Sequence, residues 1–366
     1  MDRRARKPKD RDFIETKEGM LFCVAGYLHP PDKYTAYLKY SPAPVGKWRS
    51  GEIHYHRELE YYHVSKVADT VAYLERNYPH YVHYCPIRDI KFSMIPQEYV
   101  KKYHLPEQRL PEILKTPRDP LEEEVVAFVS EIIACTGITE KDFGITGSIL
   151  LGIHNPEFSD IDLLVYGLEN ALKVRAALKE GRSATISPVT GKTLEEWCDS
   201  VAGRFPLSYE EARYLASRRW NYGFFGDRYF SIHPTRKDDE IRENYGDKTY
   251  REKGWARIRA IASDASESLF MPALYRVEEV EVIGGEVDAL PLREIVSFEG
   301  LYRDVVDSGE EIEARGKLES VNEQYYRLVI GTTALKGEGY IKPAIERKLG
   351  TSPPRLGGIE GGLVVG

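Results

Sequence analysis

The first hundred residues alternate between hydrophobic and polar positions in a way that predicts strands. Residues 20–29 and 34–40 are β-like, and they flank a turn that contains Pro30 and Pro31, an arrangement typical of a hairpin. Residues 69–78 instead place apolar side chains near helical spacing. We therefore expect residues 1–110 to form a β-rich N-terminal domain.

Two segments of this region look like connections rather than folded elements. Half of the first dozen residues are Lys or Arg, which predicts a solvated basic arm, free to touch nucleic acid or simply disordered. Residues 105–120 contain four prolines, which favours a linker between domains.

Residues 121–262 alternate predicted helices with predicted strands, which indicates an α/β or α+β domain. An amphipathic helix starts near residue 121 and ends at Gly137, and Ser208 with Glu211 forms a capping box in front of another helix. The remaining predicted elements are strands at 142–146, 160–167 and 228–234 and a helix at 168–181.

Residues 263–343 return to alternation with glycine turns, which predicts a small β-barrel-like accessory domain. This region is strongly acidic, so we do not expect it to wrap a phosphate backbone by itself. The Gly- and Pro-rich residues 344–366 predict a disordered tail. The expected fold class is therefore α+β, with β-rich domains on either side of a mixed sheet with helices.

Composition narrows the classes of protein. The 366 residues are 42% hydrophobic and 30% charged, with a net charge of −7, which is typical of a globular protein and not of a nucleic-acid coat. No apolar run reaches membrane-helix length and no signal-peptide pattern follows the start, so we expect a cytoplasmic protein without a membrane partner. The four cysteines lie far apart, which argues against structural zinc and a disulfide framework. Scarce Asn and Gln among many charged residues suggest a thermophile.

One segment carries a recognisable chemical pattern: Gly147-Ser148 follows a predicted strand, and Asp160-Ile161-Asp162 opens the next one. Side chains alternate along a strand, so Asp160 and Asp162 should project from one face. Two carboxylates side by side repel each other unless a cation lies between them, and hard oxygen ligands suit Mg²⁺. Gly147 lets the backbone approach a ligand, and Ser148 can donate its hydroxyl and its N–H to a phosphate. The segment predicts a metal–triphosphate site.

The run GS-x11-D-x-D between two strands resembles the nucleotidyltransferase signature of the DNA polymerase beta superfamily. Residues 141–167 carry the resemblance, and the whole chain resembles archaeal members with extra flanking domains. The resemblance implies transfer of a nucleoside monophosphate from an NTP to a hydroxyl acceptor, with RNA the expected acceptor and pyrophosphate released. It also implies that Gly147 and Ser148 hold the nucleotide and that Asp160 and Asp162 hold two Mg²⁺ ions, or Mn²⁺, for two-metal catalysis.

The chain departs from this superfamily at one position. A third carboxylate is expected on a later strand, but the corresponding strand, residues 228–233, has Ser231 there. Asp227, the acids at 238–240 or His233 are substitutes, or the third ligand is absent. A second hypothesis is therefore a silent nucleotide- or RNA-binding module that keeps the fold. A weaker third one is nucleotidyl transfer onto a protein.

Three other features have plain alternatives. Residues 217–237 and 251–259 combine basic side chains, in the first segment interleaved with aromatic ones, which suits a nucleic-acid strand but equally a helix end and a core strand. His54, His56 and His63 with Glu58 and Glu60 could bind a metal, but surface ion pairs explain them as well. Cys85 is expected to be a packed thiol.

Overall fold

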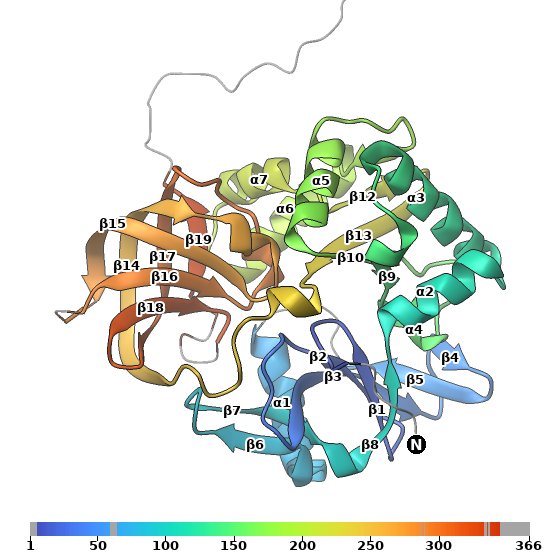
Figure 1. Ribbon diagram of the computed structural model, residues 1–366, viewed down its shortest axis with the longest axis horizontal. Helices are drawn as coiled ribbons and strands as arrows, with labels where there is room; N and C mark the ends of the chain where they lie inside the picture. Colours follow the sequence, from blue (N-terminus) through green and yellow to red (C-terminus); the bar gives the residue numbers. More distant parts are fainter. Residues whose placement is uncertain are drawn as a thin grey trace, which may run out of the picture.

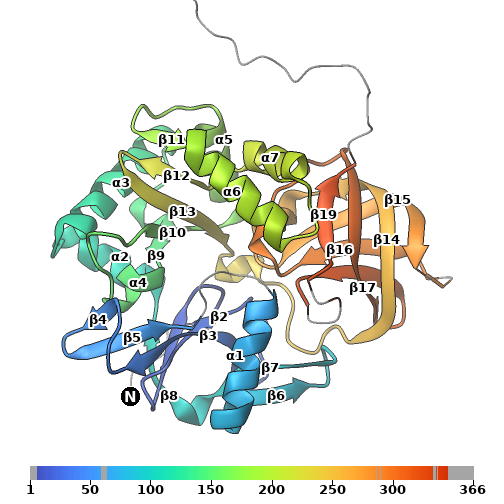
Figure 2. The same ribbon diagram turned by 180° about the vertical axis from the view of Figure 1, so that it is seen from behind.

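The computed structural model describes residues 6–58, 64–285, 287–288, 290–332, 335 and 337–344. Over these residues the protein is a mixed α+β protein, as predicted, and its strands form three sheets that surround a common centre (Figures 1 and 2). No helix in the described ranges combines the length and the apolar character that a membrane crossing would require.

The first sheet, with eight strands among the described residues, contains the N-terminal part of the chain. Its main path runs β4-β5-β3-β2-β1-β8, and β7 joins β3 and carries β6. The strands are β1 (Phe13–Thr16), β2 (Leu21–Val24), β3 (Lys33–Ala43), β4 (Trp48–Ser50), β5 (Ile53–Arg57), β6 (Val82–Cys85), β7 (Ile90–Pro96) and β8 (Val100–His104). Helix α1 (Val64–Asn77) packs against β3, β6 and β7.

The second sheet has the order β11-β12-β13-β10-β9 in the described chain. Its strands are β9 (Phe143–Ile145), β10 (Ile161–Tyr166), β11 (Ile186–Pro188), β12 (Tyr222–Phe225) and β13 (Arg228–Thr235). The helices of this part are α2 (Pro106–Lys115), α3 (Pro120–Thr136), α4 (Gly147–Leu151), α5 (Leu168–Lys179), α6 (Gly191–Arg204) and α7 (Tyr209–Arg218). Strand β10 is central: it runs antiparallel to β9 and parallel to β13.

The third sheet is formed by β14 (Tyr250–Asp264), β15 (Ala273–Gly285), β16 (Leu292–Ser297), β17 (Glu311–Val321), β18 (Tyr325–Ile330) and β19 (Tyr340–Pro343). Because β14 pairs with both β15 and β17, the pairings close on themselves and the sheet curls. The boundary expected at residue 262 falls inside β14, which belongs to this sheet from Tyr250 onward. The tail prediction for 344–366 falls, beyond Ala344, outside the described residues.

Hydrophobic cores join the three sheets. One core combines Leu150, Leu151 and Ile153, at and just after α4, with Phe13 and Leu21 of the first sheet. Another places side chains of α6 and α7 against the inner face of the third sheet, and Figure 2 shows these helices between the second and third sheets. The second sheet is therefore packed against a neighbour on each side.

The two connections predicted from the sequence are part of the fold. The solvated arm is wrong for the described residues: Lys9, Asp10 and Asp12 are buried, and Arg6 forms ion pairs with Asp12 and Glu107 at 2.6 and 2.7 Å. The proline-rich linker is also wrong, since residues 106–115 form α2. This helix has Pro106 in its first turn, where no N–H is needed, and buries Leu110 and Ile113.

Candidate functional site

The predicted glycine turn and acidic strand meet at the centre of the second sheet. Gly147 begins α4 with φ +69°, and a Cβ added there would collide with Oδ2 of Asp162. The backbone N–H of Thr146 also donates to the carbonyl of Asp162, at 2.9 Å. Because only glycine accepts this conformation without strain and leaves this space open, the backbone of the turn lies directly against the Asp162 carboxylate. Ser148 follows in α4 and is almost fully buried.

Asp160 and Asp162 lie close enough for their charges to interact strongly. Asp160 is exposed just before β10, whereas the Asp162 side chain retains 20% of its exposure. The Asp162 charge raises the pKa of Asp160 to about 6. Burial alone would raise the pKa of Asp162, but its hydrogen bond with His233 and the positive charge of Lys39 outweigh burial and hold that pKa below its usual value. The pair is therefore one firmly ionised carboxylate beside one that is easily protonated.

The place expected for a third carboxylate is occupied by a serine and a histidine. Strands β10 and β13 pair in parallel with Asp162 opposite Ser231, and the Ser231 hydroxyl donates to Oδ1 of Asp162. His233 Nε2 lies 2.8 Å from the same hydroxyl and 3.5 Å from Asp162 Oδ1. Burial, with the charge of Arg11, lowers the pKa of His233 to about 3, so this imidazole is neutral near pH 7.

The first sheet contributes positive charge that the sequence did not place here. Lys39 of β3 lowers the pKa of both aspartates, and Arg57 of β5 lowers that of Asp160. In addition, the Thr146 hydroxyl donates to the carbonyl of Arg11, at 2.8 Å. Strand periodicity could have placed Lys39 on a buried face, but it contains no information about which other sheet covers that face.

Arg228 of β13 holds the loop that leads to Asp160. Its guanidinium donates to the carbonyls of Pro156 and Ser159, at 2.9 and 3.0 Å, and pairs with Glu124 of α3 at 2.7 Å. A hydrogen bond within the loop adds to this, because the carbonyl of Asn155 accepts from the Ser159 N–H. The eleven residues between Ser148 and Asp160 thus comprise the rest of α4 and an ordered loop.

A large cavity of about 1320 Å³ lies where the three sheets meet. The N-terminal part of the chain contributes Arg11 and Tyr27 to its lining. The part that contains the second sheet contributes Arg219 and Tyr222, and the third sheet contributes Arg276, among other residues. Asp160 and Asp162 are not in its lining, so the cavity lies beside the acidic pair and does not contain it. The sequence indicated no such cavity, because its walls come from all three sheets.

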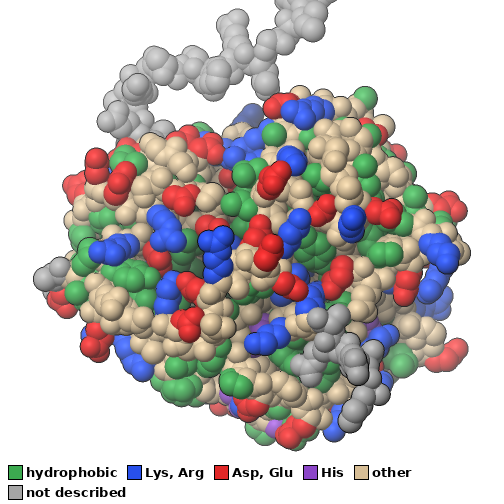
Figure 3. Space-filling model, in the orientation of Figure 1, with side chains coloured by type: hydrophobic (Ala, Val, Ile, Leu, Met, Phe, Trp, Pro, Cys, Tyr) green, Lys and Arg blue, Asp and Glu red, His purple; other side chains and the backbone are tan. Residues whose placement is uncertain are grey.

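Most basic residues proposed for nucleic-acid contact are paired inside the protein. Each of these residues from segments 217–237 and 251–259 has a carboxylate partner: Arg218 (Asp307 and Glu310), Arg228 (Glu124), Arg236 (Glu267), Lys237 (Asp142), and Arg257 and Arg259 (both Glu313). On the face drawn in Figure 3, blue and red side chains are intermixed rather than segregated. Arg219 differs, because it stacks on Tyr222.

The other metal candidates do not form a comparable site. His54 and His56 are not in the group of potential metal ligands found among the described residues, and His63 and Glu60 lie outside that range. The group that is found comprises Asp119, Glu122 and His154.

The oxygens of this group already have partners at the start of α3. Asp119 accepts from the Glu122 N–H at 3.0 Å and lies 2.8 Å from His154, while Glu122 pairs with Arg109. This arrangement is a helix cap. Cys85 is buried, as expected, with its Sγ 2.9 Å from the Tyr245 hydroxyl.

Fold and site together define a three-sheet α+β protein with two neighbouring aspartates, one of them against a glycine turn, beside a cavity lined by basic, acidic and aromatic side chains. The chain is 34% identical to the uncharacterized protein MJ1086 of Methanocaldococcus jannaschii over 348 residues, which covers 92% of this chain and 99% of that protein. It belongs to the family of that protein. No family model and no solved structure matches the chain.

Proposed function

We propose that the protein is a Mg²⁺-dependent nucleotidyltransferase of the DNA polymerase beta superfamily. The observation that carries the proposal is the packing of the Gly147 turn against Asp162, with the carboxylate of Asp160 close enough for the two charges to repel each other. In this arrangement a polyphosphate could approach bare backbone and two carboxylates at once.

The donor set fits divalent metal ions. The Asp162 charge disfavours ionisation of Asp160, and a cation held by these residues would offset that repulsion. Carboxylate oxygens are the ligands that Mg²⁺ prefers, with phosphate oxygens and water as the others. When bound, the ions supply activation of the acceptor hydroxyl and charge stabilisation of the leaving pyrophosphate.

The residues of the chain would divide the remaining work. Asp160 and Asp162 hold the ions, and the backbone at Gly147 and Ser148 orients the triphosphate. Ser231 and His233 hold the Asp162 carboxylate in one orientation, and Lys39 adds positive charge near the phosphates. The acceptor oxygen bonds to the α-phosphorus, and the bond from that phosphorus to the bridging oxygen breaks. Pyrophosphate leaves with the electron pair, and the acceptor proton passes to solvent.

Asp160→Asn and Asp162→Asn test the proposal directly. Purified protein would be incubated with each labelled NTP, Mg²⁺ and total RNA, and label transferred to the acceptor would be counted. We expect each variant to lose transfer by a factor of roughly 10³ or more, the order associated with removing charge stabilisation at a reaction centre. Asp199→Asn is the matched control, since Asp199 is exposed on α6 and has no part in the proposed site. Full turnover in Asp160→Asn would refute the assignment.

One observation favours a second function, nucleotide binding without transfer. Ser231 stands opposite Asp162 where a third carboxylate is expected. Ser231→Asp would restore a carboxylate at that place, so a silent protein should gain Mn²⁺ affinity and transfer, whereas an active one should not need the change. Tight NTP binding with no labelled product in the natural protein, followed by product in Ser231→Asp, would identify the binding module.

A further inference from the structure

Three arginines from distant parts of the chain converge on one tyrosine at the edge of the cavity. Arg219 lies over the ring of Tyr222, with Cζ 3.9 Å from its centroid, and 5.0 Å from the ring of Trp197. Arg11 and Arg303 are close enough for their charges to act on Tyr222. Burial would raise the pKa of Tyr222, but the charges of these three arginines outweigh burial and lower it.

Arg303 is the most unusual member of this cluster. Arg303 is 8% exposed, and its Nε has no hydrogen-bond partner. Its Nη2 lies 3.4 Å from Nδ1 of His233. Among the described residues, neither Arg303 nor Arg219 forms an ion pair with a carboxylate, and Arg11 is 3.7 Å from Asp10. Asp10 is itself buried and accepts the Gly26 N–H at 2.9 Å.

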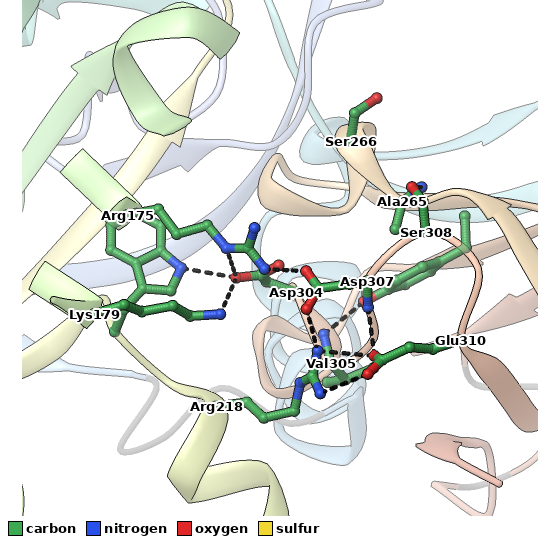
Figure 4. Close-up of polar contacts among 12 residues, drawn as sticks. Arg175, Lys179, Arg218, Ala265, Ser266, Asp304, Val305, Asp307, Ser308 and Glu310 are labelled. Atoms are coloured by element: carbon green, nitrogen blue, oxygen red, sulfur yellow. Dashed lines mark hydrogen bonds and ion pairs between the residues drawn. The ribbon is translucent and has the colours of Figure 1, made fainter. Parts of the chain in front are cut away.

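The next residue, Asp304, holds the backbone at Arg303 in place. Asp304 has φ +54° and accepts from Arg175 Nε at 2.7 Å and from Trp220 Nε1 at 2.9 Å. Figure 4 shows this network continuing through Asp307 to Arg218 and Glu310. These contacts hold the backbone next to Arg303 in place.

This arrangement is costly unless an anion completes it. A guanidinium stays charged in proteins, and a buried charge without a partner is strongly unfavourable. Three arginines face one carboxylate, which leaves an excess of about two positive charges. A phosphate ester carries −1.5 to −2 near pH 7 and offers oxygens that match the planar guanidinium fork, whereas a single carboxylate carries only −1.

We propose that the cavity between the three sheets binds a phosphorylated small molecule whose phosphate is held by Arg11 and Arg219, which both line the cavity. Arg303 is buried outside that lining and adds positive charge to this end of the cavity without contacting the ligand. The whole cavity has a volume of about 1320 Å³ and is lined in part by Trp197 and Tyr222. It therefore has room for the rest of such a ligand. This site is separate from the acidic pair: His233 lies between Arg303 and Asp162. Binding here requires neither a divalent ion nor nucleotidyl transfer.

Pyrophosphate is a suitable probe for the cluster. Full-length protein in EDTA would be titrated with millimolar pyrophosphate at constant ionic strength, and the thermal unfolding midpoint and the heat of binding would be recorded. We expect a rise in the midpoint, and we expect Arg219→Gln to weaken binding roughly tenfold or more, as loss of a charge-assisted contact does. The pyrophosphate-free Arg303→Gln protein should be as stable as the natural protein or more stable, because an uncompensated charge is gone.

Three further measurements make the outcome decisive. Arg213 is exposed on α7 and does not line the cavity. Arg213→Gln removes the same charge there and should bind pyrophosphate normally. Asp160→Asn should also bind it normally in EDTA, so failure of nucleotidyl transfer would leave this result unaffected. If Arg219→Gln does not fold, Arg11→Gln replaces it with the same expected loss.

Two results would overturn the proposal. One is that the natural protein does not respond to pyrophosphate, or that the arginine variants respond as strongly as the natural protein does. The other is citrate binding as tightly as pyrophosphate, which would show that the cluster selects carboxylates.

Discussion

At the scale of single residues, the site depends on how one carboxylate is held and the other is left free. Asp162 accepts from Ser231 and lies near His233 and Lys39, whereas Asp160 is exposed beside it. The sequence predicted the pair and its glycine neighbour, because strand alternation and a glycine turn are local properties. It did not predict Lys39, whose approach requires the first sheet to cover the second.

We expect Asp160→Asn to stabilise the metal-free protein near neutral pH. The folded-state pKa of Asp160 is about 6, above the value of 3.8 for a free aspartate. The folded protein therefore loses stability as pH rises from about 4 to about 6, when the charge forms beside Asp162. Since Asp160 is exposed and screened by solvent, the gain should be about 1 kcal/mol at pH 7.5.

Urea unfolding in EDTA at pH 7.5 and pH 4 measures this effect. The variant and the natural protein should differ at pH 7.5 and converge at pH 4, where the natural side chain is mostly protonated. Asp199→Asn should change neither curve. A variant that is less stable than the natural protein at pH 7.5 would show that Asp160 makes a favourable charged contact instead.

At the scale of elements, local patterns predicted some of the helices and strands and missed others. The helix that ends at Gly137 and the capping box of Ser208 and Glu211 are confirmed. Residues 106–115 were misread because Pro111 lies inside α2 and normally argues against a helix. Tertiary burial of Leu110 and Ile113 offsets the lost hydrogen bond, and no sequence window contains that contribution.

The hydrogen bonds from Arg228 to the loop carbonyls should stabilise the loop before Asp160 more than the ion pair between Arg228 and Glu124 does. Arg228→Met removes donors from two loop carbonyls as well as from Glu124, so it should cost about 2 kcal/mol. Glu124→Gln removes only the ion pair and should cost about 0.5 kcal/mol. Urea unfolding of both variants and of the double variant measures this difference. Equal, small effects would mean that the loop is ordered without Arg228.

At the scale of the whole molecule, the three sheets share side chains. Residues 6–12 lie buried in the fold, and the core that contains Leu151 joins α4 to β1 and β2. The Arg303 cluster and the cavity likewise draw on the N-terminal segment, the end of α7 and the loop after β16. These features exist only when all three sheets are assembled.

We expect Leu151→Ala, a change in α4, to loosen the first sheet as well as its own helix. The truncation should cost about 2 kcal/mol, the lower end for a buried leucine. Hydrogen exchange should therefore accelerate in Phe13–Thr16 and Leu21–Val24, while Leu292–Ser297 in the third sheet serves as the internal control. Unchanged protection of β1 and β2 would contradict a core shared between these two sheets.

The sequence by itself determined the alternation of strands and helices, the glycine turn and the two aspartates, because periodicity and spacing act within a few residues. Only the tertiary structure decided that the basic N-terminal segment is buried, that Lys39 lies near the aspartates, and that three arginines surround Tyr222. Those contacts join residues that are far apart along the chain. Their formation depends on which hydrophobic faces pack together, and a hydrophobic face does not encode the identity of its partner.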